Sequence, residues 1–287
     1  MAYLGEAAHD QGWREETVSK SLWPEVQSTD VEPGTVAMWW LYQAGVIVKT
    51  AGGTTVAIDP YLSEAAYRFY RVKRTVPALI DPAEVHLDAL LASHSHCDHL
   101  DPDSVPGFMK YPGCRFIGPP MAVDRVLAAG VDRDRTVRLA PGQAVATGDL
   151  EITAVFARHM VDVEPTPDAI GFIIESSSGV RLYHSGDTEY DARILPATRG
   201  VAASLLAING TGGNMNAHEA ALLAWQQQPG VAIPLHYGLW CDEDYGPGAT
   251  LDPRDFVTTY RRLSPEGTTL VFQAGTCVKL GLNGIAE

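Results

Sequence analysis

Three histidines and an aspartate lie close together in the chain, at His94, His96, Asp98 and His99. Imidazole nitrogens and carboxylate oxygens are ligands for divalent transition metals. Residues two apart in an extended segment project to the same side, so His94 and His96 can bind one ion together. Asp98 and His99 follow after a turn and would face a neighbouring position. Because four such donors cannot easily share one tetrahedral ion, the segment predicts two adjacent metal sites.

A polar loop that is rich in histidine but binds no metal is the alternative interpretation. Such a loop would not normally follow directly from an apolar strand, whereas residues 87–92 form a short apolar strand candidate that leads into the cluster. An aspartate would not normally be interleaved with the histidines either. We therefore expect this segment to bind metal.

The elements that must position these side chains are mainly short strands. Apolar runs predict strands at residues 36–41, 45–49, 54–58, 87–92, 150–157, 170–175, 181–184, 204–208, 231–235 and 269–273. Gly52 and Gly53 predict a two-residue hairpin between the second and third of these strands. The strands fall into two comparable halves, so we expect an α/β fold with two mixed sheets and helices outside them.

Four helices are expected, at residues 63–74, 121–129, 216–228 and 252–263. Asn216 and Glu219 have the spacing of a capping box at the start of the third helix. Asp252 and Pro253 provide a cap and a first-turn proline for the fourth. No internal linker separates domains. We therefore expect residues 1–33 to be a lead-in that packs on a single domain formed by residues 34–287.

The composition narrows the class of protein. The 287 residues include 35 acidic and 21 basic side chains, a formal charge of −14, and 46% of them are hydrophobic. This is a globular composition, which excludes a disordered, fibrous or disulfide-stabilised chain. Nucleic-acid binding is disfavoured because it needs a positive surface to displace counterions from phosphates.

The sequence also carries expectations about location. No apolar run approaches the roughly 20 residues that cross a bilayer, and residues 1–15 are charged and lack the apolar core of a secretory signal. The 4 cysteines are widely spaced, which suits a reducing compartment. We expect a cytoplasmic protein with a small-molecule substrate, no membrane partner and a homo-oligomer as an open alternative.

The pattern His-x-His-x-Asp-His after a strand resembles the signature of the metallo-β-lactamase superfamily. The resemblance implies a four-layer αβ/βα sandwich and further ligands at the ends of later strands, at His159, Asp187 and His236. It implies that His94, His96 and His159 hold one metal, that Asp98, His99 and His236 hold a second, and that Asp187 bridges them. His184, just before the turn that carries Asp187, is expected to support the site without ligating a metal.

A closer resemblance is to the L-ascorbate-6-phosphate lactonase, or UlaG-like, branch of that superfamily. It rests on the stretch Pro-Gly-Thr-Val-Ala-Met-Trp-Trp-Leu at residues 33–41, on Tyr-His-Ser-Gly-Asp-Thr at 183–188 and on Ile-Pro-Leu-His at 233–236. The resemblance implies a metal-dependent hydrolase that opens a lactone or a related carboxylic ester, including that of an anionic or phosphorylated small molecule. It suggests manganese, whereas the superfamily at large suggests zinc.

Two adjacent divalent ions lower the pKa of a bridging water toward about 7 and polarise a carbonyl or phosphoryl oxygen. Asp98 and Asp187 are the expected catalytic carboxylates, and Asp98 could also accept a proton from the attacking water. The same centre would suit a phosphodiesterase or other phosphoester hydrolase. A non-catalytic metal-binding scaffold is the alternative from a different class.

Two regions are candidates for binding the substrate. Arg68, Arg71 and Arg74 recur at three-residue intervals, which on a helix would place them on one side as a binding site for a phosphate or carboxylate. A solvated helix face or an oligomer contact is the alternative. Asn214, in a glycine-rich loop, and Trp240, shortly after His236, are expected in the pocket wall, although a plain connection and core packing are the respective alternatives.

Overall fold

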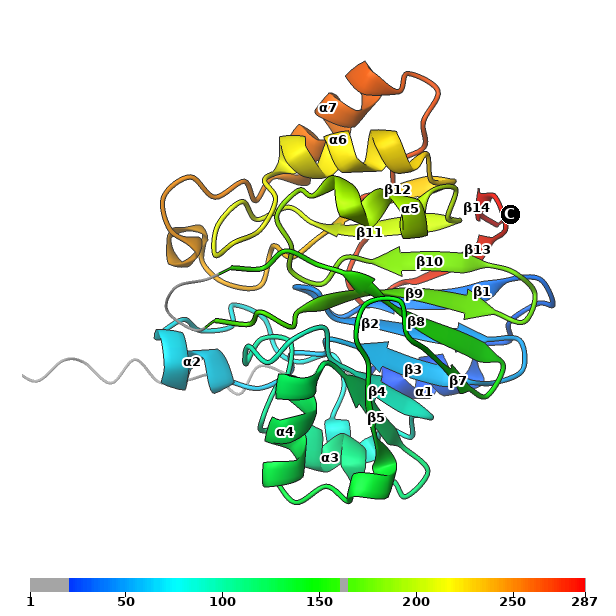
Figure 1. Ribbon diagram of the computed structural model, residues 1–287, viewed down its shortest axis with the longest axis vertical. Helices are drawn as coiled ribbons and strands as arrows, with labels where there is room; N and C mark the ends of the chain where they lie inside the picture. The colour runs from blue at the N-terminus through cyan, green and yellow to red at the C-terminus, as the bar shows by residue number, and fades with distance from the viewer. Residues whose placement is uncertain (1–20, 161–164, 287) are drawn as a thin grey trace, which may run out of the picture.

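The computed structural model describes residues 21–160 and 165–286, and within them two mixed β-sheets pack face to face (Figure 1). The first sheet has the order β14-β13-β1-β2-β3-β4-β5-β6 and the second the order β12-β11-β10-β9-β8-β7. The first sheet consists of β1 (Val36–Trp40), β2 (Val46–Thr50), β3 (Thr55–Ile58), β4 (Ala89–Leu91), β5 (Arg115–Gly118), β6 (Thr136–Arg138), β13 (Cys277–Gly281) and β14 (Gly284–Ile285). The second consists of β7 (Ala144–Thr147), β8 (Leu150–Phe156), β9 (Ile170–Ser176), β10 (Arg181–His184), β11 (Ala203–Ala207) and β12 (Val231–Leu235).

Helices cover the outer faces of both sheets. Figure 1 shows α5 (Leu195–Thr198), α6 (Ala217–Gln227) and α7 (Pro253–Leu263) on the side of the second sheet. On the side of the first sheet lie α1 (Trp23–Ser28), α3 (Val105–Met109) and α4 (Pro120–Ala128), while α2 (Ala65–Tyr70) lies among the loops at one end. The predicted four-layer αβ/βα sandwich is confirmed.

The alternation of side chains along β1 explains why both of its faces are buried. Met38 and Trp40 belong to the core between the two sheets. Ala37 and Trp39 point the other way and pack in a second core with residues of α1, α3 and α4. Successive side chains of a strand point to opposite faces, so a strand that is apolar throughout needs a layer on each side.

The direction of the strands collects the polar side chains at one edge. β3, β4 and β5 run parallel in the first sheet, and β10, β11 and β12 run parallel in the second. β8 is antiparallel to β9, which is antiparallel to β10, so β8 runs in the same direction as β10. The carboxyl ends of these strands therefore meet along one edge, which is where open α/β sheets bind ligands.

Both sequence-predicted helix caps are confirmed. The side chain of Asn216 accepts hydrogen bonds from the backbone N–H groups of His218 and Glu219, and the Glu219 carboxylate accepts one from the N–H of Asn216. The Asp252 side chain accepts a hydrogen bond from the backbone N–H of Arg254 at the start of α7. These bonds satisfy amide donors that a helix start leaves free.

The predicted lead-in is described only from residue 21 onward, and residues 1–20 lie outside the described part. Within α1, Trp23 and Val26 are buried against the first sheet. The Lys49 ammonium group donates hydrogen bonds to the carbonyl oxygens of Val26, Gln27 and Thr29. This part of the lead-in thus packs on the domain, and the domain boundary itself stays a prediction.

Two predicted elements differ from the structure: the hairpin between β2 and β3, and the strand expected at residues 269–273. The β2–β3 hairpin is wider than two residues: Gly53 donates to the carbonyl of Thr50 and has a φ of 90°, the left-handed residue of a three-residue loop. The strand expected at residues 269–273 is wrong, since only Thr269 pairs, with Ala232. The next amide on β12 would belong to Pro234, which has no N–H to continue the ladder.

The helix expected at residues 63–74 is also wrong in its extent. α2 ends at Tyr70, and Arg71 follows in the left-handed region with a φ of 63°. Arg74 then turns inward, where its guanidinium donates a 2.5 Å hydrogen bond to the carbonyl of Tyr61. A continued helix could not bring Arg74 to that position.

Within the described residues, no helix is long and apolar enough to cross a bilayer.

Candidate metal centre

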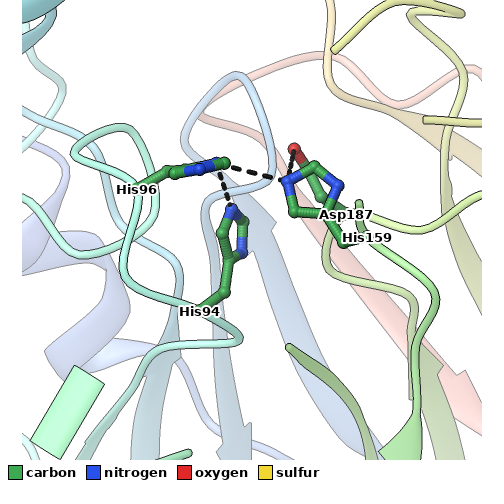
Figure 2. A group of neighbouring side chains, drawn as sticks. All are labelled: His94, His96, His159 and Asp187. Atoms are coloured by element: carbon green, nitrogen blue, oxygen red, sulfur yellow. Dashed lines mark hydrogen bonds and ion pairs between the residues drawn. The ribbon is translucent and has the colours of Figure 1, made fainter. Parts of the chain in front are cut away.

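Four of the predicted ligands converge into one buried group, shown in Figure 2. His94 and His96 follow β4, His159 follows β8 and Asp187 follows β10. His96 Nδ1 lies 2.9 Å from His94 Nε2 and 3.2 Å from His159 Nε2. Asp187 Oδ2 lies 3.8 Å from His159 Nε2. Three nitrogens and one carboxylate oxygen thus surround a single point.

The remaining three predicted ligands form a second buried group beside the first. His99 Nε2 lies 3.2 Å from His236 Nε2. Asp98 Oδ2 lies 3.5 Å from His236 Nε2 and 3.7 Å from His99 Nε2. His236 follows β12 with a φ of 67°, a left-handed conformation that turns its ring toward the other two.

Asp187 connects the two groups, because its two oxygens face different ones. Oδ2 belongs to the group of His159, while Oδ1 lies 3.2 Å from both His99 Nε2 and His236 Nε2. His184 holds the turn that carries Asp187: its Nδ1 accepts a hydrogen bond from the Gly186 N–H, and its Nε2 donates to the carbonyl of Ala44. Both ring nitrogens of His184 are therefore occupied by backbone groups, as expected of a supporting residue.

The donors fit a pair of metal ions. Ligand atoms around a tetrahedral zinc lie about 3.4 Å apart when each metal–nitrogen distance is about 2.0–2.1 Å, close to the spacings observed. His159 Nδ1 lies 3.1 Å from the carbonyl of Gly213, which can only accept, so the proton sits there and Nε2 presents a lone pair. Asp187 Oδ1 is buried and lies 3.2 Å from Nε2 of both His99 and His236.

Asp59 is a site residue that sequence reasoning missed. It directly follows β3, is buried, and accepts hydrogen bonds from the Ser93 N–H at 2.7 Å and the Ser93 hydroxyl at 2.6 Å. Its Oδ2 also lies 2.8 Å from His99 Nδ1. The carboxylate thereby holds the Nδ1 proton of His99 and leaves Nε2 free for a metal, a common arrangement of metal-binding histidines. A carboxylate at the end of a strand parallel to β4 was the signal that could have identified it.

The charges of the centre are strongly coupled. Burial by itself would lower the pKa of His99, but the carboxylates of Asp187, Asp98 and Asp59 raise it well above its ordinary value. Burial would raise the pKa of Asp187, but His236 and His99 lower it well below its ordinary value. Asp187 is therefore ionised at neutral pH, and without metal the cationic charge that balances it is carried by protonated imidazole.

A cavity of about 320 Å³ opens over the centre. His96, Asp98, Asp187 and His236 contribute to its lining from the two donor groups. Predicted Asn214 and Trp240 also line it, so the structure brings both to the site. Asn209, Thr211 and Gly212 line it as well, from the same glycine-rich loop as Asn214, whereas the wall residues that sequence reasoning missed are Tyr70, Val72, Asp244 and Tyr245.

The three arginines predicted to bind the substrate are not brought together. Arg68 forms an ion pair with Asp103 on the surface, and Arg71 lies over the ring of Tyr67. Arg74 is turned inward by its bond to the backbone, and none of the three lines the cavity. The expected one-sided arginine patch is therefore wrong, because the helix that would have aligned it ends at Tyr70.

Comparison with known proteins agrees with this architecture. A family model described as "Beta-lactamase superfamily domain" matches residues 54–237. The chain is 30% identical over 264 residues to the probable L-ascorbate-6-phosphate lactonase UlaG of Escherichia fergusonii, with 75% of this chain and 73% of the relative covered.

Two solved structures share the fold. One is Igni18, described as a novel metallo hydrolase from Ignicoccus hospitalis, with a TM-score of 0.64, 21% identity, and 85% of this chain and 98% of that chain covered. The other is the metallo-β-lactamase fold protein YhfI from Bacillus subtilis, with a TM-score of 0.62, 16% identity, and 86% and 99% covered. The family match and the identity to the lactonase show that the chain belongs to the metallo-β-lactamase superfamily, as a metal-dependent hydrolase similar to UlaG.

Proposed function

We propose that this hydrolase opens a lactone, or cleaves a related carboxylic ester, at a centre that holds two divalent metal ions. The observation that carries the proposal is the position of Asp187, whose two carboxylate oxygens face two separate buried groups of donors. The similarity to a probable lactonase supports the choice of reaction.

The two donor groups support a separate position for each ion. His94, His96, His159 and Asp187 would hold one, and Asp98, His99, His236 and Asp187 the other. Histidine and carboxylate ligands suit manganese or zinc. When bound, such ions lower the pKa of a coordinated water and polarise a carbonyl oxygen.

The protein's own groups supply position and charge. Burial would raise the pKa of Asp98, but the neighbouring His99 and His236 lower it, so the carboxylate is ionised at neutral pH and can accept a proton from water. Trp240 and Tyr245 pack with ring centroids 5.1 Å apart in the cavity wall, where they shield bound substrate from bulk water. The cavity volume of about 320 Å³ favours a small molecule.

Ester hydrolysis is favoured over phosphoester hydrolysis by the lining of the cavity. Among its described residues there is no lysine or arginine to bind the charge of a phosphodiester. The metal donors alone do not separate the two reactions. The choice between ester and phosphoester hydrolysis therefore depends on the residues of the cavity wall, and a panel of substrates tests it.

The test uses purified protein loaded in turn with manganese and zinc. Lactones of several ring sizes and bis(p-nitrophenyl) phosphate serve as substrates, and elemental analysis reports bound metal. We expect lactone hydrolysis that is lost in His96→Ala and Asp98→Ala. His218→Ala is the matched control, since His218 is exposed on α6 and bonds Thr259 there.

Three results would contradict the proposal. Preferential cleavage of the phosphodiester would point to the phosphoester alternative. Metal-replete protein without activity on any substrate of the panel would favour a non-catalytic scaffold. Undiminished activity of the Asp98→Ala variant would show that this centre does not take part in the reaction.

A further inference from the structure

Asn214 holds an unused hydrogen-bond acceptor in the wall of the cavity. The residue is only 7% exposed, and it lines the cavity over the metal donors. Its Oδ1 atom is buried and has no hydrogen-bond partner among the described residues. A buried polar atom without a partner loses the hydrogen bonds it would make to water, a cost of about 1–3 kcal/mol. Such an atom in the wall of a cavity is a candidate for binding a ligand.

A chain of hydrogen bonds fixes which end of the Asn214 amide is free. The carbonyl of Thr211 can only accept, and the Asn209 amide nitrogen donates to it at 3.3 Å. Asn209 must therefore turn its Oδ1 the other way, where it accepts a 2.9 Å hydrogen bond from the amide nitrogen of Asn214. The Oδ1 of Asn214 is therefore the amide atom that has no partner among the described residues. The group that the loop leaves unpaired in the cavity wall is thus an oxygen acceptor and not an N–H donor.

The other walls indicate the charge of the ligand. The described lining contains Asp244 in addition to the metal-binding carboxylates, and it contains no lysine or arginine. Trp240 contributes a neutral donor, since its indole N–H is buried and has no partner among the described residues. Arginine is the side chain that pairs well with carboxylate and phosphate groups. The side chains of the walls therefore offer no cationic group to pair with an anion away from the metal ions, and they suit an uncharged substrate.

We propose that Asn214 is a specificity-determining residue that accepts a hydrogen bond from a hydroxyl or N–H group of an uncharged substrate. This inference rests on the proposed ester hydrolysis and adds the class of substrate: a lactone or ester with a donor group near its carbonyl, not a phosphorylated one. Asn209 is a positioning residue that acts by holding the amide of Asn214.

The experiment compares ligands that differ by one hydroxyl group. The metal-loaded protein is tested with α-hydroxy-γ-butyrolactone and γ-butyrolactone as substrates. 2-Hydroxycyclopentanone and cyclopentanone serve as ligands without a hydrolysable bond, with dissociation constants from saturation-transfer NMR. Wild type is compared with Asn214→Ala and Asn209→Ala. Asn283→Ala, on the exposed β13–β14 turn, is the matched asparagine control.

We expect wild type to prefer the hydroxylated member of each pair. Asn214→Ala should reduce that preference by roughly three- to tenfold, the effect of one neutral hydrogen bond, through KM and the dissociation constant of the hydroxylated ligand alone. Asn209→Ala should reduce it less, because the acceptor is still present but free to rotate. Asn283→Ala should leave it unchanged.

The outcomes separate the inference from the proposed function. Equal binding of both ketones by wild type, or the same preference in wild type, Asn214→Ala and Asn209→Ala, overturns the inference even if lactones are hydrolysed. Selective binding of the hydroxyketone that Asn214→Ala abolishes supports it even if neither lactone is a substrate, in which case only the proposed reaction fails. If Asn214→Ala does not fold, Asn209→Ala decides by the same comparison.

Discussion

Replacing Asp59 with asparagine is expected to weaken one metal position and spare the other. Asp59 accepts three hydrogen bonds, two from Ser93 and one from His99 Nδ1. Its φ of 48° lies in the left-handed region, which asparagine tolerates as well as aspartate does. The backbone can therefore stay unchanged while one carboxylate oxygen becomes an NH₂ group.

The consequence follows from which atoms can reverse their roles. Asparagine Oδ1 can still accept from the Ser93 N–H, and the Ser93 hydroxyl can rotate to accept from the new amide. His99 Nδ1 would face a donor and must give up its proton, which moves to Nε2. That nitrogen lies 3.2 Å from Asp187 Oδ1, where the second ion is expected to bind. A protonated nitrogen cannot ligate a metal.

Loss of such a supporting group typically costs 10–100-fold in metal affinity, or about 1.4–2.8 kcal/mol. We expect this loss at the group of Asp98, His99 and His236, and little change at the group of His94. Metal content after dialysis against graded chelator, together with calorimetric titration, would separate the two positions. Asp149→Asn is the matched control, because Asp149 also accepts a side-chain hydrogen bond, from Thr50, but contacts no histidine.

Equal loss at both positions would show that Asp59 acts on the whole fold and not through the His99 ring. Unchanged affinity at both would show that the imidazole proton is not held by this carboxylate. Either result refutes the reasoning from hydrogen-bond roles. A loss of the same size in Asp149→Asn would do so as well.

Three further predictions concern the same centre. Asp187→Asn should lower the affinity of both positions and reduce kcat by at least about 100-fold, because the bridging charge is removed; elemental analysis and initial rates would check this, and loss of a single ion would contradict it. The pKa values of His99 and His236 are raised in the metal-free chain, so metal binding should release protons at neutral pH, and metal affinity should rise with pH until both rings are neutral. Calorimetry in buffers of different ionisation enthalpy would measure the released protons, and proton uptake would contradict the prediction. Gly186→Ala should destabilise the protein by about 2–4 kcal/mol, because Gly186 has a φ of 54° and an added Cβ would lie 2.6 Å from the Cβ of Ser93. An unchanged midpoint of thermal unfolding would refute this prediction.

The first four metal donors could be predicted from sequence because their signal is local, whereas His159, Asp187 and His236 were predicted from the resemblance to the superfamily. His94, His96, Asp98 and His99 lie in one segment, and the two later histidines each follow an apolar run. Three of the short strands that were missed offer less: β6, β7 and β13 consist mostly of half-buried or exposed residues, so they show no clear apolar pattern.

What the sequence could not show depends on contacts between distant residues. Arg74 follows a helical spacing, yet its hydrogen bond to Tyr61 accompanies a chain that has already left the helix. Asp59 resembles an ordinary strand-ending residue until the parallel pairing of β3 with β4 brings it to Ser93 and His99. The free oxygen of Asn214 is defined only by the amide of Asn209. No periodicity or motif in the sequence indicates the hydrogen bond of Arg74, those of Asp59 or the free oxygen of Asn214.

The backbone carries unfavourable conformations where the donors meet. Among the described residues, six that are not glycine have positive φ, and four of them, Tyr42, Gln43, Asp59 and His236, lie at this edge. Gln43 connects them, because its carbonyl accepts hydrogen bonds from the His236 N–H and from the Trp40 indole, and its side chain accepts one from Tyr245. Left-handed backbone costs about 1–2 kcal/mol per residue, so these bonds and the surrounding core must hold the turns in place. The protein itself therefore forms this edge, and the candidate metal donors converge before any ion is bound.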